Sequence, residues 1–463
     1  MINDPGLTKL EFDPKVLQNP TTASRVAQGD SSFLEITTLE LQELEKLVVD
    51  IASLPWLGHG DLGRAMEFLQ PISEPTRSYL WALGHAVKAG NSAHSAVLYS
   101  KAISEFNRLL KSTPDSMDII LAVKIHNGLG NCLAALGESS NEGDAIHLLL
   151  DAVASYKEAL NCFPRKSSPL LWAKVCANLG ACLQSLGERV TGLEGTRHLR
   201  ESVALSTEAQ KEYNRVENPQ EWVDTHQNLG AALLSLGVRT DGEEAYHYIT
   251  EARKTLEEAL AHFSAGENPV KCAKISMNLG LALCRLGEIC EGDEGVIRLR
   301  ESIALLNNSA NEFKKDSYPV MWAQSRSCLG SALSLLGARL GGKTGRALQE
   351  EAVEFFRAAL TVRTREKWPQ QWGMTQMGMG NAYLRIARIE DGGVGAANIL
   401  LALWAFDKVL DASDENLSHI RDIAINGRIA ALKLRQVRNL DQSWPLTGER
   451  DMKEGSSLGD QVS

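Results

Sequence analysis

Apolar residues recur at helical spacing through most of this chain, in units that repeat every 50 residues. In the unit from Pro219 to Ala261, Leu229 and Leu236 fall on the apolar side of a first helix. A second amphipathic stretch covers 248–260 after a short loop. Two helices with apolar sides, joined by a short loop, pack against each other. Each unit therefore predicts an antiparallel helix hairpin.

Proline and glycine mark where these helices should begin and end. Pro219 suits the first turn of a helix, where its missing N–H costs nothing. We expect Gly237 to end the same helix, because a C-terminal Gly adopts the left-handed conformation that caps helices. A loop containing Gly242 should follow. Proline opens other units in the same register, at Pro169, Pro269, Pro319 and Pro369.

A glycine at a fixed place in each first helix is the strongest mark of the repeat. Three units carry the tripeptide Asn-Leu-Gly and three carry near copies, and the glycines that end them are Gly130, Gly180, Gly230, Gly280, Gly330 and Gly380. In the second helix, small residues flank a larger one, as at Ala252, Leu256 and Ala259. This alternation lets helix ridges enter facing grooves. A fixed period of this length is typical of stacked supersecondary units.

The motif Asn-Leu-Gly-x-Ala-Leu-x-x-Leu-Gly, with small and aromatic positions in the second helix, resembles the tetratricopeptide repeat (TPR). The resemblance covers about 119–413 and implies an all-α fold, a right-handed superhelical solenoid of antiparallel helix hairpins. Family units have about 34 residues, so the extra residues of these units are expected to lengthen the helices. Units of this length resemble arrays joined to CHAT peptidase domains in bacterial proteins, here without the peptidase.

The repeat sets the expected domain organisation. Residues 119–413 form six repeats, and arrays of this kind need atypical end units to cover their exposed cores. We therefore assign 33–118 to N-terminal capping helices with a degenerate repeat, and 414–437 to a C-terminal capping helix. Segment 1–32, which contains several prolines, is expected to be loosely ordered, and the Gly/Ser-rich tail 438–463 to be disordered.

Composition and charge narrow the class of partner. The chain is 44% apolar and 23% charged, as folded proteins are. Its net charge of -10 disfavours nucleic-acid binding through a general basic surface. No run approaches the ~20 apolar residues of a membrane span, so we expect no membrane insertion and a cytoplasmic location. Cys132 and Cys182 share a repeat position that holds Ala in other units, which indicates structural thiols.

Two segments match nucleotide-binding patterns that the repeat explains better. Segment 337–344 fits GxxxxGK[ST], but that motif needs a buried strand before it, and a predicted helix precedes it here. Segment 58–63 fits GxGxxG without the strands of a dinucleotide fold. The ten His residues form no ligand set, and the recurring Trp residues are expected to pack in the core. We therefore expect no cofactor, no metal and no catalytic residue.

The candidate working surface follows from the resemblance. In the family, the first helix of each hairpin lines the concave face, which implies that this face binds a protein or peptide. Its polar residues supply hydrogen-bond donors and acceptors, and its methionines supply adaptable apolar contact. The partner-binding residues that the resemblance implies are Lys124, Asn127, Asn131, Lys174, Gln227, Lys274, Met277, Met374, Met377 and Asn381.

The pattern therefore favours a non-catalytic scaffold or adaptor. About 50 residues follow the last unit, too few for a peptidase domain, so we expect a free-standing protein. The alternative is an accessory or catalytic subunit of an enzyme system, with a site in the groove or in the N-terminal region. A third hypothesis is structural, in which solenoids assemble through their ends. The oligomeric state stays open.

Overall fold

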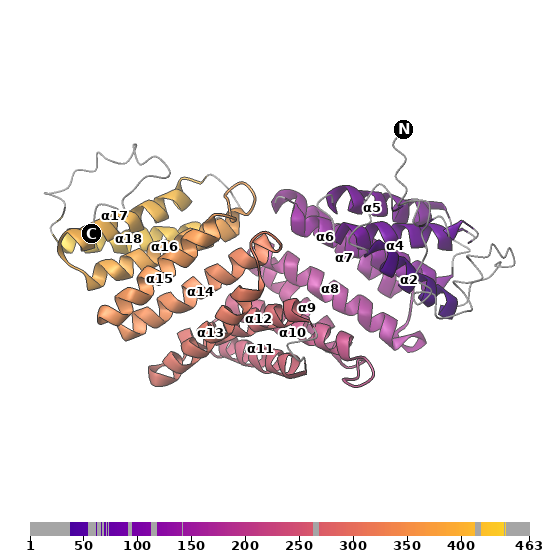
Figure 1. Cartoon of the computed structure of the whole chain (residues 1–463), viewed down its shortest axis with the longest axis horizontal. Helices are drawn as coiled ribbons and strands as arrows, with labels where there is room; N and C mark the ends of the chain where they lie inside the picture. Colours follow the sequence, from indigo (N-terminus) through magenta and orange to yellow (C-terminus); the bar gives the residue numbers. More distant parts are fainter. Residues whose placement is uncertain are drawn as a thin grey trace, which may run out of the picture. The chain divides into compact units, whose positions relative to one another are not determined.

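Helices alone build the part of the chain that the structure describes. The computed structural model describes residues 38–440, apart from 91–94, 113–117, 141, 263–267, 413–417, 439 and most of 54–73. Within these residues no strand forms. The chain divides into two compact units, described below, and successive helices pack side by side within each of them (Figure 1). The predicted all-α solenoid of antiparallel helix hairpins is confirmed. The predicted segment 1–32 and nearly all of 438–463 lie outside the described residues.

The chain divides into two compact units, of which unit 1 covers Met1–Thr240. Within the predicted capping region, α4 and α5 form a hairpin in which Ala102 and Phe106 are buried. The elements of unit 1 are α2 (Thr38–Ala52), α4 (Thr76–Gly90), α5 (Ser95–Ser112), α6 (Ile119–Ser139), α7 (Glu142–Asn161), the short 3-10 helix η2 (Arg165–Ser167), α8 (Pro169–Arg189), α9 (Gly192–Gln210) and α10 (Pro219–Arg239).

Unit 2 covers Asp241–Ser463. Its helices are α11 (Gly242–His262), α12 (Pro269–Ile289), α13 (Gly292–Glu312), α14 (Pro319–Leu340), α15 (Gly342–Leu360), α16 (Pro369–Ile389), α17 (Gly392–Leu410) and α18 (Ser418–Val437). We call the first helix of each repeat A-type, from α6 to α16 in even numbers, and the second B-type, from α7 to α17 in odd numbers. The two helices of the third repeat, α10 and α11, belong to different units.

Proline begins the A-type helices α8, α10, α12, α14 and α16, as the sequence predicts. The predicted end at Gly237 is wrong, because α10 continues to Arg239. Gly187, at the same place in α8, gives the reason. A Cβ there would lie 2.8 Å from Leu199 Cγ and 2.9 Å from the Gly195 oxygen, both in α9. Glycine at this place therefore allows the B-type helix to approach and does not end the A-type helix.

The left-handed glycines lie instead at the start of the B-type helices. Gly192 has φ of +70° and Gly242 has φ of +62°, a conformation that glycine adopts without steric cost. Only Val190 and Thr191 separate α8 from α9, so the chain reverses in a short connection. The helices have 21 and 19 residues. The extra residues of the long repeat therefore lengthen the helices, as predicted.

Aromatic rings of α5 and of the B-type helices explain a second set of glycines. A Cβ at Gly378 of α16 would lie 2.7 Å from Phe356 Cζ of α15, so the ring packs against bare backbone. Phe106 with Gly128 and Phe406 with Gly427 form the same pair. Where the B-type helix carries Leu306 in place of the ring, the following helix has Cys328 in place of the glycine. In these pairs close packing couples side-chain size across the helix interface, whereas Tyr156, with Asn178 in the following helix, departs from the pairing.

Arginines near the ends of A-type helices tie neighbouring repeats together. Arg239 of α10 donates a hydrogen bond to the Val190 oxygen at 2.9 Å, and Arg339 of α14 donates one to the Cys290 oxygen at 2.6 Å. Both acceptors follow the last turn of the preceding A-type helix, where carbonyls lack partners within the helix. A Cβ at Gly295 would lie 2.8 Å from the Arg339 guanidinium, so this glycine makes room for it.

Two described helices, α6 and α17, have the length and composition of a membrane span. In the fold, α6 packs against α5, α7 and α8, and α17 packs against α16 and α18. An apolar helix with neighbours on several sides is what a repeat core requires. The core therefore accounts for the apolar character of both helices.

Candidate partner-binding surface

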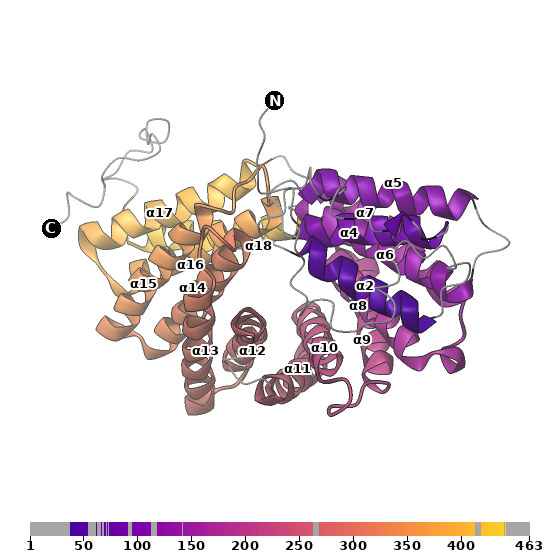
Figure 2. The ribbon, with the colours of Figure 1, turned by 45° about the vertical axis from the view of Figure 1, so that its right-hand side comes forward.

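The A-type helices form a continuous layer within each unit. In unit 1, α8 contacts both α6 and α10 (Figure 1). In unit 2, α14 contacts α12 and α16, and α16 contacts α18, a succession that Figure 2 shows from a second direction. Each B-type helix packs against an A-type helix that precedes or follows it in the chain. We call the side of the A-type helices that carries the predicted binding residues the A-face.

Lys124 is engaged by the N-terminal helices. Its Nζ lies 2.7 Å from Glu45 Oε1 of α2, and its side chain is only 12% exposed. Tyr79 of α4 donates a hydrogen bond to the same carboxylate oxygen at 2.8 Å. The charge of Lys124 is therefore neutralised within unit 1, and a partner carboxylate would compete with Glu45 for it.

The asparagines of unit 1 link helices to each other. Asn127 is buried, and its Oδ1 accepts a hydrogen bond from Asn178 Nδ2 of the next A-type helix at 3.0 Å. Asn131 is exposed, and its Oδ1 accepts from the Tyr156 hydroxyl at 2.7 Å. The Asn131 amide nitrogen remains a donor at the surface. Asn178 belongs to the Asn-Leu-Gly motif, so one function of that asparagine is to join successive A-type helices.

Two further predicted residues of unit 1 differ in exposure. The side chain of Lys174 in α8 is exposed. Gln227 in α10 is partly buried, and within the described part of the chain its Oε1 is buried without a hydrogen-bond partner. A buried carbonyl oxygen without a donor is costly. Lys174 and Asn131 are therefore the predicted residues of unit 1 that present polar groups to solvent.

The predicted residues of unit 2 separate into core and surface. Met277 of α12 and Met377 of α16 are 7% and 5% exposed, and both belong to the apolar core of unit 2. Met374 is 55% exposed. Lys274 and Asn381 are half-buried. Met374 therefore offers the largest apolar contact among the predicted residues of this unit.

A buried arginine outside the predicted set also reaches the A-face of unit 2. Arg363, which follows α15, is 8% exposed. Its Nη1 donates a hydrogen bond to Thr375 Oγ1 of α16 at 3.1 Å, and its Nη2 donates one to Gln324 Oε1 of α14. Gln324 occupies the repeat position of the predicted residues Lys274 and Met374. The sequence signal that could have identified Arg363 is its position in the repeat. Three other repeats carry an aromatic residue at the same position, namely Phe163, Tyr213 and Phe313.

The recurring tryptophans are half-buried, and cations lie over the rings of Trp172, Trp222 and Trp322. The Arg165 guanidinium carbon lies 4.6 Å from the centre of the Trp172 ring, and Lys315 Nζ lies 5.2 Å from that of Trp322. The unit that has Cys272 in place of Trp has Ala265 in place of the cation. The expected core packing of the tryptophans is therefore partial, and a cation–π contact covers the exposed ring face.

The nucleotide-like segment 337–344 has helical surroundings. Gly337 lies inside α14, Gly342 begins α15 with φ of +54°, and Lys343 and Thr344 are exposed in its first turn. A P-loop follows a strand, whereas this segment follows the helix α14. The glycines of the match are therefore explained by their positions in the repeat. Most of the GxGxxG segment 58–63 lies outside the described residues. Across the described residues, no group of three His, Cys, Asp or Glu side chains is placed to hold a metal ion.

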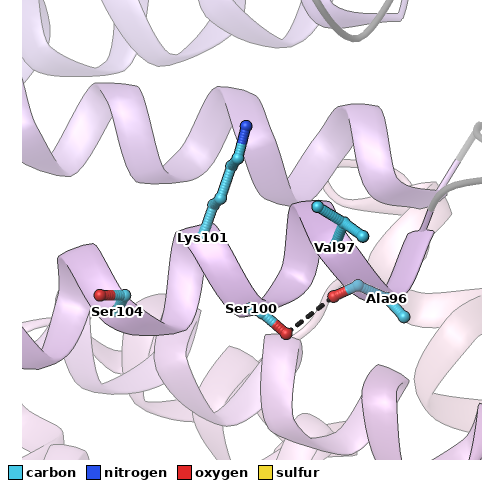
Figure 3. Close-up of a pocket in the computed structure, with 5 residues that line it drawn as sticks. All are labelled: Ala96, Val97, Ser100, Lys101 and Ser104. Carbon is cyan, nitrogen blue, oxygen red and sulfur yellow. Dashed lines mark hydrogen bonds between the residues drawn. The ribbon is translucent and has the colours of Figure 1, made fainter.

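A shallow depression on α5 offers little chemistry. Its lining comes from one helix, and Ser100 Oγ in it donates to the Ala96 oxygen at 2.9 Å within that helix (Figure 3). Lys101 is the one charged side chain among the lining residues, which are Ala96, Val97, Ser100, Lys101 and Ser104. A single cation on an open helix face does not assemble a catalytic or cofactor site.

Comparison with known proteins finds no family model and no curated protein that matches this chain. Solved structures that resemble it include the apo form of RapI, 12% identical over 92% of this chain and 98% of that chain, with a TM-score of 0.39. The nuclear import adaptor Nro1 of S. pombe is 11% identical over 83% of this chain and 99% of its own, with a TM-score of 0.27. Yeast Tom70 is 12% identical over 92% of this chain and 95% of its own, with a TM-score of 0.25.

Proposed function

We propose that this chain is a non-catalytic scaffold or adaptor that binds a protein or peptide through the A-face. The observation that carries the proposal is the contrast between a repeated core and a varied surface. Glycine recurs at one place in every A-type helix, whereas one A-face position changes from repeat to repeat. In unit 1 it holds Lys124, Lys174 and Asp224, and in unit 2 it holds Lys274, Gln324 and Met374. Within each unit, a constant core therefore supports a row of different side chains, as recognition of an extended partner requires.

The experiment substitutes exposed residues of this row. The tagged full-length chain is used to capture partners from a lysate of its source organism, and bound proteins are identified by mass spectrometry. Lys174→Glu inverts a charge on the A-face of unit 1, and Met374→Glu places a charge on that of unit 2. Ile297→Glu is the matched control, because Ile297 is 52% exposed on the B-type helix α13.

We expect the A-face variants to lose a partner that the wild type and Ile297→Glu both retain. A charge placed in the centre of an interface costs about 2 kcal/mol or more, which is roughly a 30-fold loss of affinity. Retention of every partner by both A-face variants would exclude this surface. The location in the cytoplasm stays a prediction, which cell fractionation tests.

The enzymatic alternative has a direct test of its own. Lys343 is the residue that a phosphate-binding loop in segment 337–344 would require. The purified chain is assayed for bound nucleotide and metal, and for nucleotide hydrolysis, as the wild type and as Lys343→Ala. We expect neither content nor turnover to depend on Lys343. An activity that the substitution abolishes would replace the adaptor proposal with an enzyme.

A further inference from the structure

One repeat of unit 2 places a cation where other repeats place an aromatic ring. The residue that follows the B-type helix is Phe163, Tyr213 or Phe313 in three other units, and each of these is buried. In the fifth repeat the same position holds Arg363, which is buried to the same degree as Tyr213, each being 8% exposed. An aromatic ring fills this space elsewhere, so packing alone does not require a guanidinium.

Among the described residues, the groups that hold this guanidinium are neutral. Its two hydrogen bonds go to the Thr375 hydroxyl and to the Gln324 amide oxygen. Within the described residues no carboxylate pairs with Arg363, and burial lowers its pKa from the usual range. A buried cation without a counter-ion destabilises the fold, because its charge has been removed from water. An aromatic residue at this site would carry no such desolvation cost.

A second guanidinium at the contact between α14 and α16 also donates a hydrogen bond to a neutral group, although the charge of Glu288 acts on it as well. Arg385 of α16 is half-buried and donates a hydrogen bond to Ser334 Oγ of α14 at 2.6 Å. Ser334 lies ten residues beyond Gln324 in α14, which is about 15 Å along the helix. An extended peptide covers this distance with about five residues.

We propose that the seam between α14 and α16 is a recognition site for acidic side chains of an extended peptide, with Arg363 as its principal anion-binding group. This inference rests on the proposed function and specifies the chemistry of the partner. Gln324 is half-buried and its amide oxygen occupies the place that a carboxylate oxygen takes. Arg363 then exchanges a neutral acceptor for a charged one, which forms shorter and stronger hydrogen bonds. Met374, exposed beside Thr375, gives the peptide an apolar contact.

The test uses a defined probe and the full-length chain. The probe is hexaglutamate, fluorescently labelled at its N-terminus and amidated at its C-terminus, so that side chains supply every carboxylate. Hexaglutamine with the same ends is the neutral control peptide. Binding is measured by fluorescence anisotropy, and the stability of each variant is measured by urea denaturation.

Two substitutions at the site separate recognition from folding. Arg363→Phe restores the aromatic residue of other repeats, and we expect it to weaken hexaglutamate binding about 30-fold or more without loss of stability. Gln324→Glu supplies a carboxylate from within the chain, and we expect it to raise stability while it blocks the probe. Lys343→Gln removes an exposed cation of the same unit and should leave the affinity within about twofold.

Several results would overturn the inference. These are equal binding of hexaglutamate and hexaglutamine by the wild type, undiminished binding by Arg363→Phe, or undiminished binding by Gln324→Glu. The proposed function is tested separately. If Met374→Glu loses the captured partner while Arg363→Phe keeps it, the A-face binds that partner without the acidic recognition inferred here.

Discussion

The contact between Gly378 and Phe356 gives a quantitative test of how the repeats pack. The substitution Gly378→Ala adds one methyl group that would start 2.7 Å from Phe356 Cζ. Carbon atoms prefer about 3.5–4.0 Å, so the two groups overlap by about 1 Å. The ring is 1% exposed in the core of unit 2 and has no open space to enter. Overpacking of this kind costs about 1–3 kcal/mol.

Helix propensity opposes this cost. Alanine stabilises a helix interior by about 1 kcal/mol relative to glycine, so the expected net loss at Gly378 is about 0–2 kcal/mol. The matched control is Gly143→Ala in α7, where a Cβ would have no atom within 4 Å. That substitution should be neutral or stabilise the chain by up to about 1 kcal/mol.

A double-mutant cycle isolates the contact. Phe356→Leu replaces the ring with the smaller side chain that the preceding repeat has at this position, Leu306. In the helix that follows Leu306, the residue in phase with Gly378 is Cys328. In this background Gly378→Ala should no longer destabilise. The measurements are urea denaturation and hydrogen exchange of the amides in α15 and α16, because repeats open locally. A loss at Gly378 that persists with Phe356→Leu would refute steric coupling between the two positions.

Two further predictions concern the arginine ties and the buried thiols. Arg239→Ala should lower the free energy of unfolding by about 1–2 kcal/mol, because it removes charge-assisted hydrogen bonds to helix-end carbonyls; Arg339→Ala should cost less, since Arg339 is exposed. Equal losses in urea denaturation would contradict this order. Burial raises the pKa of Cys132 and Cys284 to about 12, so about one thiol in 10⁴ is ionised at pH 8. In a titration with a thiol reagent, the exposed Cys162 should react first, and early reaction of Cys132 would contradict the burial.

The sequence predicts the helices of this fold well because each repeat offers the same evidence again. Pro219 and its equivalents begin A-type helices where expected, since the physical reason is local to the first turn. The predicted end at Gly237 failed because glycine has two uses, a left-handed turn or a close contact. Only the neighbouring helix distinguishes them. Gly187 faces Leu199, whereas Gly192 provides the left-handed turn.

The candidate surface was less predictable, because exposure depends on partners outside the repeat register. Lys124 and Lys174 hold the same repeat position, yet Glu45 of α2 neutralises the first and the second is exposed. Met277 and Met377 lie at positions that the TPR resemblance assigns to the binding face, and both are buried. A fixed phase gives the direction of a side chain, but neighbouring helices determine its contacts.

Comparison among repeats of one chain also distinguishes structural needs from functional ones. The pairs Phe356 with Gly378 and Leu306 with Cys328 change together, so each difference is compensated in the core. Arg363 also replaces an aromatic residue, but within the described residues its new partners are neutral and leave its charge unbalanced. Proteins retain costly buried polar groups chiefly at sites of function. A residue that differs from its equivalents in other repeats, and whose difference the fold does not compensate, therefore points to a ligand. Because Arg363 is positively charged, the ligand that we infer for it is an anion.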